Sequence, residues 1–147
     1  MKKKTAVILM LSILMLLLCA CRDMQPYSLY YPVDRVAAIE IVEVIQQESD
    51  DYETVKNAKV LASVPPEQFQ QFAEDLHELP RLAVWNDPEF LIMGKFIRVQ
   101  YDNGEFEAIL YHCTALFLEK NDYFVKDVWS NFPREAYYSM LEKYLPQ

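Results

Sequence analysis

The chain of 147 residues is acidic: 22 aspartate and glutamate residues stand against 14 lysine and arginine residues, and the formal net charge is −8. Because an acidic excess repels phosphate groups, the composition argues against nucleic-acid binding and against docking on anionic lipid through a basic patch. The sequence has only two glycines, too few for a glycine-rich phosphate loop or a dinucleotide fingerprint, so we expect no nucleotide cofactor. Cationic proteins or peptides and metal ions remain as candidate partners.

The first 20 residues have the pattern of an export signal. Three lysines follow the initial methionine, and an uncharged apolar run of 14 residues, Thr5–Leu18, comes next. As a helix this run spans roughly 21 Å, which is less than the roughly 30 Å of a bilayer's hydrocarbon core. We therefore predict that residues 1–20 are a cleaved signal peptide and not a permanent membrane span.

The end of this signal, Leu18-Cys19-Ala20-Cys21, resembles the lipobox of bacterial lipoproteins, in which small residues precede a lipidated cysteine. The resemblance implies cleavage between Ala20 and Cys21, a diacylglyceryl group on the sulfur of Cys21, and acylation, for example by palmitate, of its amine. Two or three acyl chains anchor a protein stably, because each buried CH₂ contributes about 0.8 kcal/mol. The implied location is the extracytoplasmic face of a bacterial membrane. The alternative is an ordinary secretory signal, with Cys21 present by chance.

The chain from Cys21 onward has the composition of one packed domain. Its 127 residues include 11 basic and 22 acidic side chains, which gives a formal charge of −11. We expect a lipidated tether over residues 21–34 and a single domain over residues 35–147. Cys113 is the other cysteine of this part, and burial of its thiol is favoured over intermolecular pairing. Three tyrosines of the tether either lie at the headgroup level or pack back on the domain: Tyr27, Tyr30 and Tyr31.

Several segments of the first half predict regular structure. Val36–Ile45 is rich in β-branched residues on both faces, which predicts a central strand, and Lys59–Val64 predicts a second one. The polar stretch Gln46–Asn57 between them is typical of a loop or a hairpin excursion. A helix is expected from Pro65 to Pro80, and Arg81–Trp85 predicts a short strand. The buried stripe of that helix is formed by Phe69, Phe72, Ala73, Leu76 and Leu79.

A β-hairpin is predicted around Asn103-Gly104, the strongest two-residue turn signal in the chain. With these two residues at the turn, one face of the hairpin is apolar. The opposite face pairs Gln100 with Glu107 and Arg98 with Ile109, which makes it mostly polar. The apolar face consists of Ile97, Val99, Tyr101, Phe106, Ala108 and Leu110.

The last third predicts a further pair of strands and a closing helix. Thr114–Leu118 and Tyr123–Trp129 are the strands, and Asn131 is expected to cap a helix that has Pro133 in its first turn. The helix buries Tyr137, Met140, Leu141 and Tyr144. The fold class is therefore α+β, with an antiparallel β-meander sheet packed on one face by two amphipathic helices. Residues 36–145 are similar in pattern to small domains without an assigned activity that many bacterial lipoproteins carry.

Few side chains offer catalytic or metal-binding chemistry. His77, His112 and Cys113 are fewer than the four ligands of a structural zinc site, so we expect no metal. A Cys113–His77 dyad is the sharpest hypothesis for nucleophilic catalysis, although a buried thiol and a solvated histidine are favoured. The carboxylate pairs Asp50-Asp51 and Asp87/Glu89 lie in predicted turns, where acidic residues are common.

A candidate partner-binding site is formed by Trp85, Asp87 and Glu89, which combine an aromatic ring with two acids in a predicted turn. The alternative places Trp85 in the core, with the acids solvating the loop. The sequence favours a lipid-anchored, extracytoplasmic binding module without catalytic activity, bound to the membrane through Cys21 and to a cationic protein or peptide. Two alternatives stay open: a small thiol-dependent enzyme using Cys113, and an envelope inhibitor or immunity-type protein that masks a basic partner.

Overall fold

The computed structural model describes residues 25–47, 50–83, 92–119, 122–125 and 130–146. The strands and helices, with 3-10 turns labelled η, are in chain order η1 (Val33–Arg35), β1 (Val36–Val44), α2 (Asp51–Lys56), β2 (Lys59–Ser63), η2 (Pro66–Gln68), α3 (Phe69–Glu78), β3 (Leu82–Ala83), β4 (Gly94–Tyr101), β5 (Phe106–Ile109), β6 (Thr114–Glu119), β7 (Asp122–Val125), β8 (Ser130–Asn131) and α4 (Arg134–Glu142). None of the helices in these ranges has the length and apolarity that crossing a membrane requires.

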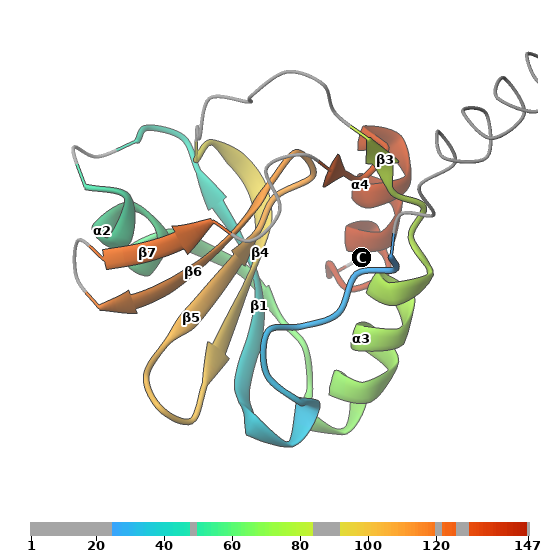
Figure 1. Ribbon diagram of the computed structural model, residues 1–147, viewed down its shortest axis with the longest axis horizontal. Coiled ribbons are helices and arrows are strands. Elements are labelled where there is room, and N and C mark those ends of the chain that lie inside the picture. The colour runs from blue at the N-terminus through green and yellow to red at the C-terminus, as the bar shows by residue number, and fades with distance from the viewer. Residues whose placement is uncertain (1–24, 48–49, 84–91, 120–121, 126–129, 147) are drawn as a thin grey trace, which may run out of the picture.

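The main sheet is antiparallel and has six strands in the order β2-β1-β4-β5-β6-β7. From β4 to β7, each strand pairs with the next one along the chain, which is the predicted meander. Helices α3 and α4 lie together on one face of this sheet (Figure 1). The predicted α+β fold class is therefore confirmed.

Both faces of the sheet are buried, which explains why β1 is apolar on both sides. The face under α3 and α4 carries the first core, whose larger members are Tyr27, Phe72, Leu76, Ile97, Phe132 and Tyr137. The opposite face carries the second core, which includes Val42, Val55, Phe96, Phe106, Cys113 and Phe117. Since side chains alternate along a strand, consecutive residues such as Phe96 and Ile97 enter different cores.

Helix α2 covers the second core, at a place where the sequence predicted a loop or a hairpin excursion. The Asp50 carboxylate accepts hydrogen bonds from the backbone N–H groups of Tyr52 and Glu53, which caps the first turn. Val55 is fully buried in the second core, and the partly buried Tyr52 packs against that core. The loop prediction was wrong because a helix of six residues is too short to show a helical period in its apolar residues.

A buried arginine joins α2 to the sheet. The Arg98 guanidinium donates to the carbonyl oxygens of Val55 and Lys56 at 2.8 and 2.6 Å, so it binds the C-terminal end of α2. It also forms a salt bridge with Glu40 on the neighbouring strand, with Nη2 and Oε2 2.6 Å apart. Gln100 donates a further hydrogen bond to the same oxygen of Glu40 at 3.0 Å.

The hairpin forms at the predicted place, but its predicted register was wrong by one residue. Tyr101 and Glu105 close a three-residue loop, in which Gly104 has a φ of +86°. A three-residue loop that ends in a left-handed glycine is the next common hairpin turn after the two-residue one. The observed pairs are Gln100 with Phe106 and Val99 with Glu107. As a result Glu107 faces the first core, and the apolar face predicted for the hairpin is divided between the two cores.

The closing helix, α4, buries Tyr137, Met140 and Leu141 as predicted, and Tyr144 is partly buried. The predicted cap was wrong: α4 begins after Pro133, and no side chain caps it. Asn131 instead belongs to β8, where it pairs with Leu82 of β3 in a short second sheet. The strand predicted at Arg81–Trp85 corresponds to β3 within the described residues.

Candidate binding groove

The N-terminal segment, which we define as residues 25–33, packs on the domain and does not extend away from it. Tyr27 is only 1% exposed and lies in the first core, with its ring edge-on to Phe132 at a centroid distance of 5.6 Å. The Arg81 guanidinium lies over both rings, 5.3 Å from the centroid of Tyr27 and 5.1 Å from that of Phe132. Tyr27 therefore packs back on the domain and does not lie at the level of the lipid headgroups, which were the two alternatives for the tether tyrosines. The packed domain thus begins before residue 35.

Glu107 holds this segment from inside the sheet. Its carboxyl group is fully buried and accepts hydrogen bonds from the hydroxyl of Tyr27, from the backbone N–H of Tyr30 at 3.0 Å and from the hydroxyl of Tyr101 at 2.5 Å. Burying a carboxyl group is costly unless donors surround it, and here three donors do so. Burial, together with the adjacent Glu107 carboxyl group, raises the pKa of Tyr101 well above its ordinary value. The N-terminal segment is thus bound to a side chain that the predicted register had placed on a polar face.

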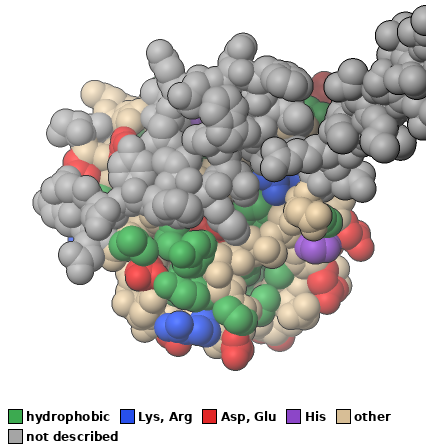
Figure 2. Space-filling view, in the orientation of Figure 1, with side chains coloured by type: hydrophobic (Ala, Val, Ile, Leu, Met, Phe, Trp, Pro, Cys, Tyr) green, Lys and Arg blue, Asp and Glu red, His purple; other side chains and the backbone are tan. Residues whose placement is uncertain are grey.

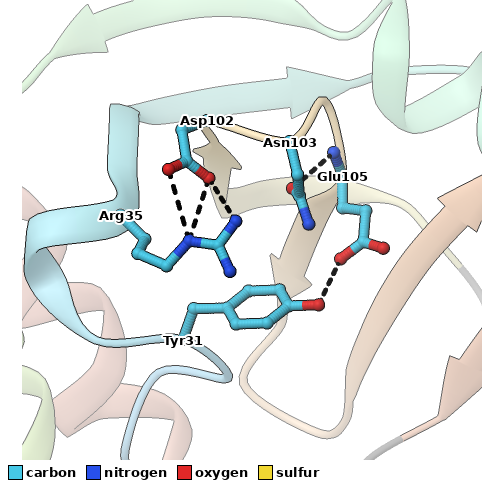
Figure 3. A network of polar contacts seen from close by, with 5 residues as sticks. All are labelled: Tyr31, Arg35, Asp102, Asn103 and Glu105. Atoms are coloured by element: carbon cyan, nitrogen blue, oxygen red, sulfur yellow. Dashed lines mark hydrogen bonds and ion pairs between the residues drawn. The ribbon is translucent and has the colours of Figure 1, made fainter.

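A second, exposed network ties the end of the segment to the hairpin loop (Figure 3). The Tyr31 hydroxyl donates to Glu105 at 2.6 Å, which raises the pKa of Tyr31. The Arg35 guanidinium lies over the Tyr31 ring and forms a salt bridge of 2.6 Å with Asp102, and its hydrogen bond lowers the pKa of that carboxyl group. Because these charges face water, the network contributes little to stability.

An open groove of about 540 Å³ lies between the N-terminal segment and α3. We call it the α3 groove. Its first wall consists of residues 27–33, among them Tyr27, Tyr30 and Tyr31, and its second wall consists of Gln70, Ala73, Glu74, His77 and Glu78. Figure 2 shows acidic side chains gathered around a histidine on the α3 side of the molecule. The volume lies within the range of small-molecule pockets.

The α3 groove contains several acceptors, although Gln70 in its lining is a donor that already binds the Glu74 carboxylate at 2.8 Å. His77 Nδ1 lies 2.9 Å from the carbonyl oxygen of Tyr27. Since a carbonyl group only accepts, Nδ1 carries the hydrogen, and Nε2 of the neutral ring is then an acceptor. Glu74 and Glu78 add two carboxylates, and the described residues that line the groove include no lysine or arginine. Acceptors and tyrosine rings together suit a cationic ligand.

Cys113 and His77 do not form the hypothesised dyad. The thiol is 2% exposed in the second core, whereas His77 lies on α3, which packs against the opposite face of the sheet. Burial raises the pKa of Cys113 to about 12, so the thiol stays protonated near neutral pH, and the reactive species of cysteine is the thiolate. The expectation that Cys113 is buried is confirmed.

The remaining candidates from the sequence divide into two groups. Asp50 caps α2, and Asp51 accepts a hydrogen bond from Gln47 at 2.7 Å, so both carboxylates belong to the local structure of that helix. In the described part of the chain, no group of three or more histidine, cysteine, aspartate and glutamate side chains is placed to hold a metal ion. The other candidates lie outside the described residues: Cys21, Trp85, Asp87 and Glu89.

Sequence reasoning missed both Glu107 and the α3 groove. The only available signal for Glu107 was its position between the apolar residues Phe106 and Ala108, whose meaning depends on the register. The groove joins segments about 45 residues apart, which no local pattern reports. Comparisons with family models, curated proteins and solved structures found no match for this chain, so the groove has to be interpreted from its own chemistry.

Proposed function

We propose that this protein is a lipid-anchored, extracytoplasmic binding module of the bacterial cell envelope, which binds a cationic partner and has no catalytic activity. The observation that carries the binding function is the α3 groove, with its tyrosine wall and the carboxylates of Glu74 and Glu78. The proposed location is supported by the resemblance of Leu18–Cys21 to a lipobox.

The charge of the protein supports the same class of partner. With a formal charge of −11 after removal of the signal, the domain attracts cationic molecules over a distance set by the ionic strength. An envelope inhibitor or immunity-type protein that masks a basic partner is a special case of this proposal. The thiol-dependent alternative gains no support from Cys113, because its thiol is buried and its pKa is raised.

The lipid anchor is tested by palmitate labelling of growing cells and by membrane fractionation. We expect the wild type to incorporate palmitate and to sediment with membranes, and Cys21→Ala to lose both properties. Cys113→Ala is the matched control, because it removes the other cysteine that remains after cleavage, and it should keep the label. Equal labelling of wild type and Cys21→Ala would contradict the anchor.

The binding function is tested by crosslinking in whole cells, followed by recovery of the tagged protein. We expect a crosslinked product that weakens strongly at high salt, since attraction between exposed charges is screened. The absence of any salt-sensitive product would contradict a cationic partner. Turnover of a substrate by the purified protein, with the activity lost in Cys113→Ala, would contradict the proposal that it is not an enzyme.

A further inference from the structure

We propose that the N-terminal segment is a releasable strap, which detaches from the domain as a unit while the sheet stays folded and thereby lengthens the tether to the membrane. The effect on the tether rests on the proposed lipid anchor at Cys21, whereas the detachment itself does not. The inference is carried by the shallow packing of the segment, by the side chains that fasten it and by a fixed pivot at its end.

The segment is buried at a single position. Of its nine residues, all of which the structure describes, Tyr27 is buried, three are partly buried and five are exposed. The six strands of the main sheet pair without any residue of the segment. The α3 groove also separates the segment from part of α3. Because a region with few buried side chains opens at a lower free energy than the core does, we expect the segment to open before the sheet unfolds.

Side chains of the domain hold the segment close to this one buried position. The Glu107 carboxyl group accepts hydrogen bonds from the Tyr27 hydroxyl and from the backbone N–H of Tyr30, and His77 Nδ1 donates to the carbonyl oxygen of Tyr27. These contacts lie within four residues of chain, so they form and break together. Glu107 is fully buried while the segment is docked, and release lets water reach it. Hydration of this carboxyl group offsets part of the loss of its hydrogen bonds.

The segment ends at a pivot that stays attached to the hairpin. The backbone N–H of Arg35 donates to the carbonyl oxygen of Pro32 at 3.0 Å, and the backbone N–H of Asp102 donates to that of Arg35 at 2.9 Å. Of the contacts in Figure 3, release breaks those of Tyr31, whereas Arg35 keeps its salt bridge with Asp102. The chain before Pro32 can therefore swing away without disturbing β1 or the hairpin.

Release changes the reach of the proposed lipid anchor. With the segment docked, the extended chain from Cys21 to Tyr27 spans about 20 Å; with the segment released, the chain from Cys21 to Pro32 spans about 36 Å. A partner that lies further from the bilayer than the docked tether allows is bound only by the released form. Its binding therefore shifts the equilibrium towards release.

The direct test is native-state hydrogen exchange of the full chain in detergent micelles, followed by NMR. The Tyr30 amide reports docking, because it donates to Glu107. We expect this amide to exchange at least about a hundredfold faster than the slowest amides of β4 and β5, and at least about tenfold more slowly than an unstructured amide. Low concentrations of urea should accelerate the slowest sheet amides and hardly affect the Tyr30 amide, because local opening exposes little surface.

Two tyrosine variants separate local release from global unfolding. Tyr27→Phe removes a hydroxyl that Glu107 accepts and keeps the ring, so it should accelerate exchange of the Tyr30 amide about tenfold. The matched control is Tyr144→Phe, which removes a hydroxyl bonded to the carboxylate of Asp75, away from the segment. This control should accelerate the slowest sheet amides about fivefold and leave the Tyr30 amide within about twofold of the wild type.

The change in reach is measured by energy transfer in phosphatidylcholine vesicles that contain an acceptor-labelled lipid. The donor dye is attached to Asn103→Cys in the exposed hairpin loop; Cys113 is 2% exposed and should not take the dye. We expect Tyr27→Ala, added to this labelled chain, to lower the transfer efficiency, because its segment is released. Continued protection of the β4 and β5 amides shows that this variant is folded.

The inference is overturned if the Tyr30 amide exchanges as slowly as the slowest sheet amides or as fast as an unstructured one. Equal acceleration of the Tyr30 and sheet amides by Tyr144→Phe would also overturn it, as would equal energy transfer with and without Tyr27→Ala. A chain that takes up palmitate, but whose Tyr30 amide opens only with the sheet, would sink the strap alone. Local opening in a chain that takes up no palmitate would uphold the strap and sink the proposed anchor.

Discussion

Two buried charged residues on neighbouring strands, Glu107 on β5 and Arg98 on β4, fasten peripheral segments to opposite faces of the sheet. Glu107 binds the N-terminal segment over the first core, and Arg98 binds α2 over the second. Their partners differ. The donors to Glu107 include two phenols and one backbone amide, whereas Arg98 has an anionic partner in Glu40. Both side chains reach backbone groups, so each one positions a stretch of chain that the hydrophobic effect alone would orient poorly.

The difference between the two sites lies in what remains when the charged residue is removed. Loss of Glu107 leaves the hydroxyls of Tyr27 and Tyr101 without this acceptor deep in the first core. Loss of Arg98 leaves Glu40, whose side chain is 16% exposed and reaches water more readily. A buried polar group without a partner costs more than one that water can solvate, so Glu107 should be the more sensitive site.

The largest effect is expected for Glu107→Ala. We predict a loss of about 4 kcal/mol in the free energy of unfolding, because three hydrogen bonds end on this one carboxyl group. Urea denaturation measures the loss, and limited proteolysis should show cleavage within residues 25–33. Glu107→Gln keeps an acceptor and should lose less. A decrease of under about 1 kcal/mol for the alanine variant would show that the segment is held by packing alone.

Arg98→Met should have the second largest effect, a loss of about 3 kcal/mol. Methionine keeps the length of the apolar stem but bonds neither Glu40 nor the carbonyl groups of Val55 and Lys56. Hydrogen exchange should locate the damage in α2 and leave the amides of α3 protected. Deprotection of α3 to the same extent would contradict the assignment of Arg98 to the second face.

A smaller effect, dependent on pH, is expected at Asp75, which links α3 to the end of α4. Burial alone would raise the pKa of its carboxyl group, but hydrogen bonds from Gln71, Tyr144 and Lys143 hold it below the ordinary value. The unfolded chain therefore binds the proton more readily, and the stability that Asp75 contributes is complete above about pH 5 and lost as the pH falls below about 4.

The variant Asp75→Asn should lose about 1 kcal/mol of unfolding free energy near neutral pH, and its stability should depend less on pH in the acidic range than that of the wild type. Urea denaturation at a series of pH values measures both quantities. Asp34→Asn, at an exposed aspartate, is the control and should keep the wild-type profile. Parallel profiles for Asp75→Asn and the wild type would refute the linkage.

The smallest effect is expected in the exposed network of Figure 3. Arg35→Gln removes the salt bridge with Asp102 and the cation over Tyr31. Because Arg35 and Asp102 both face water, we expect no change in thermal unfolding beyond experimental error. A clear decrease in the unfolding temperature would mean that this network, and not Glu107, is what holds the N-terminal segment.

The sequence was sufficient for the fold class but not for the register that creates the candidate site. Asn103-Gly104 located the hairpin, but this sequence is compatible with a loop of either two or three residues. The alternation of apolar residues could not decide between them, because Ala108 and Ile109 are both apolar and both faces of β5 are buried. The one-residue difference moves Glu107 from a mostly polar face into the first core.

Two further features could not be predicted from the sequence: the short helix α2 and the α3 groove. Helix α2 has only six residues and is capped by the Asp50 side chain. From composition alone, this polar segment is indistinguishable from a loop. The groove depends on Tyr27 packing beside α3, and nothing in the spacing of Tyr27, Tyr30 and Tyr31 distinguishes a ring in the core from one at a lipid surface. Tertiary contacts of this kind have no local sequence signature.

The buried position of Tyr27 also sets how far the domain can move from a bilayer. With Cys21 lipidated as proposed, the chain from Cys21 to Tyr27 reaches at most about 20 Å when fully extended. Such a short tether restricts the search for a partner to the two dimensions of the membrane. It also raises the local concentration of a partner held in the same leaflet toward the millimolar range. Even a weak affinity for a cationic partner would then suffice when that partner is bound to the same membrane, whereas the same partner free in solution would remain mostly unbound.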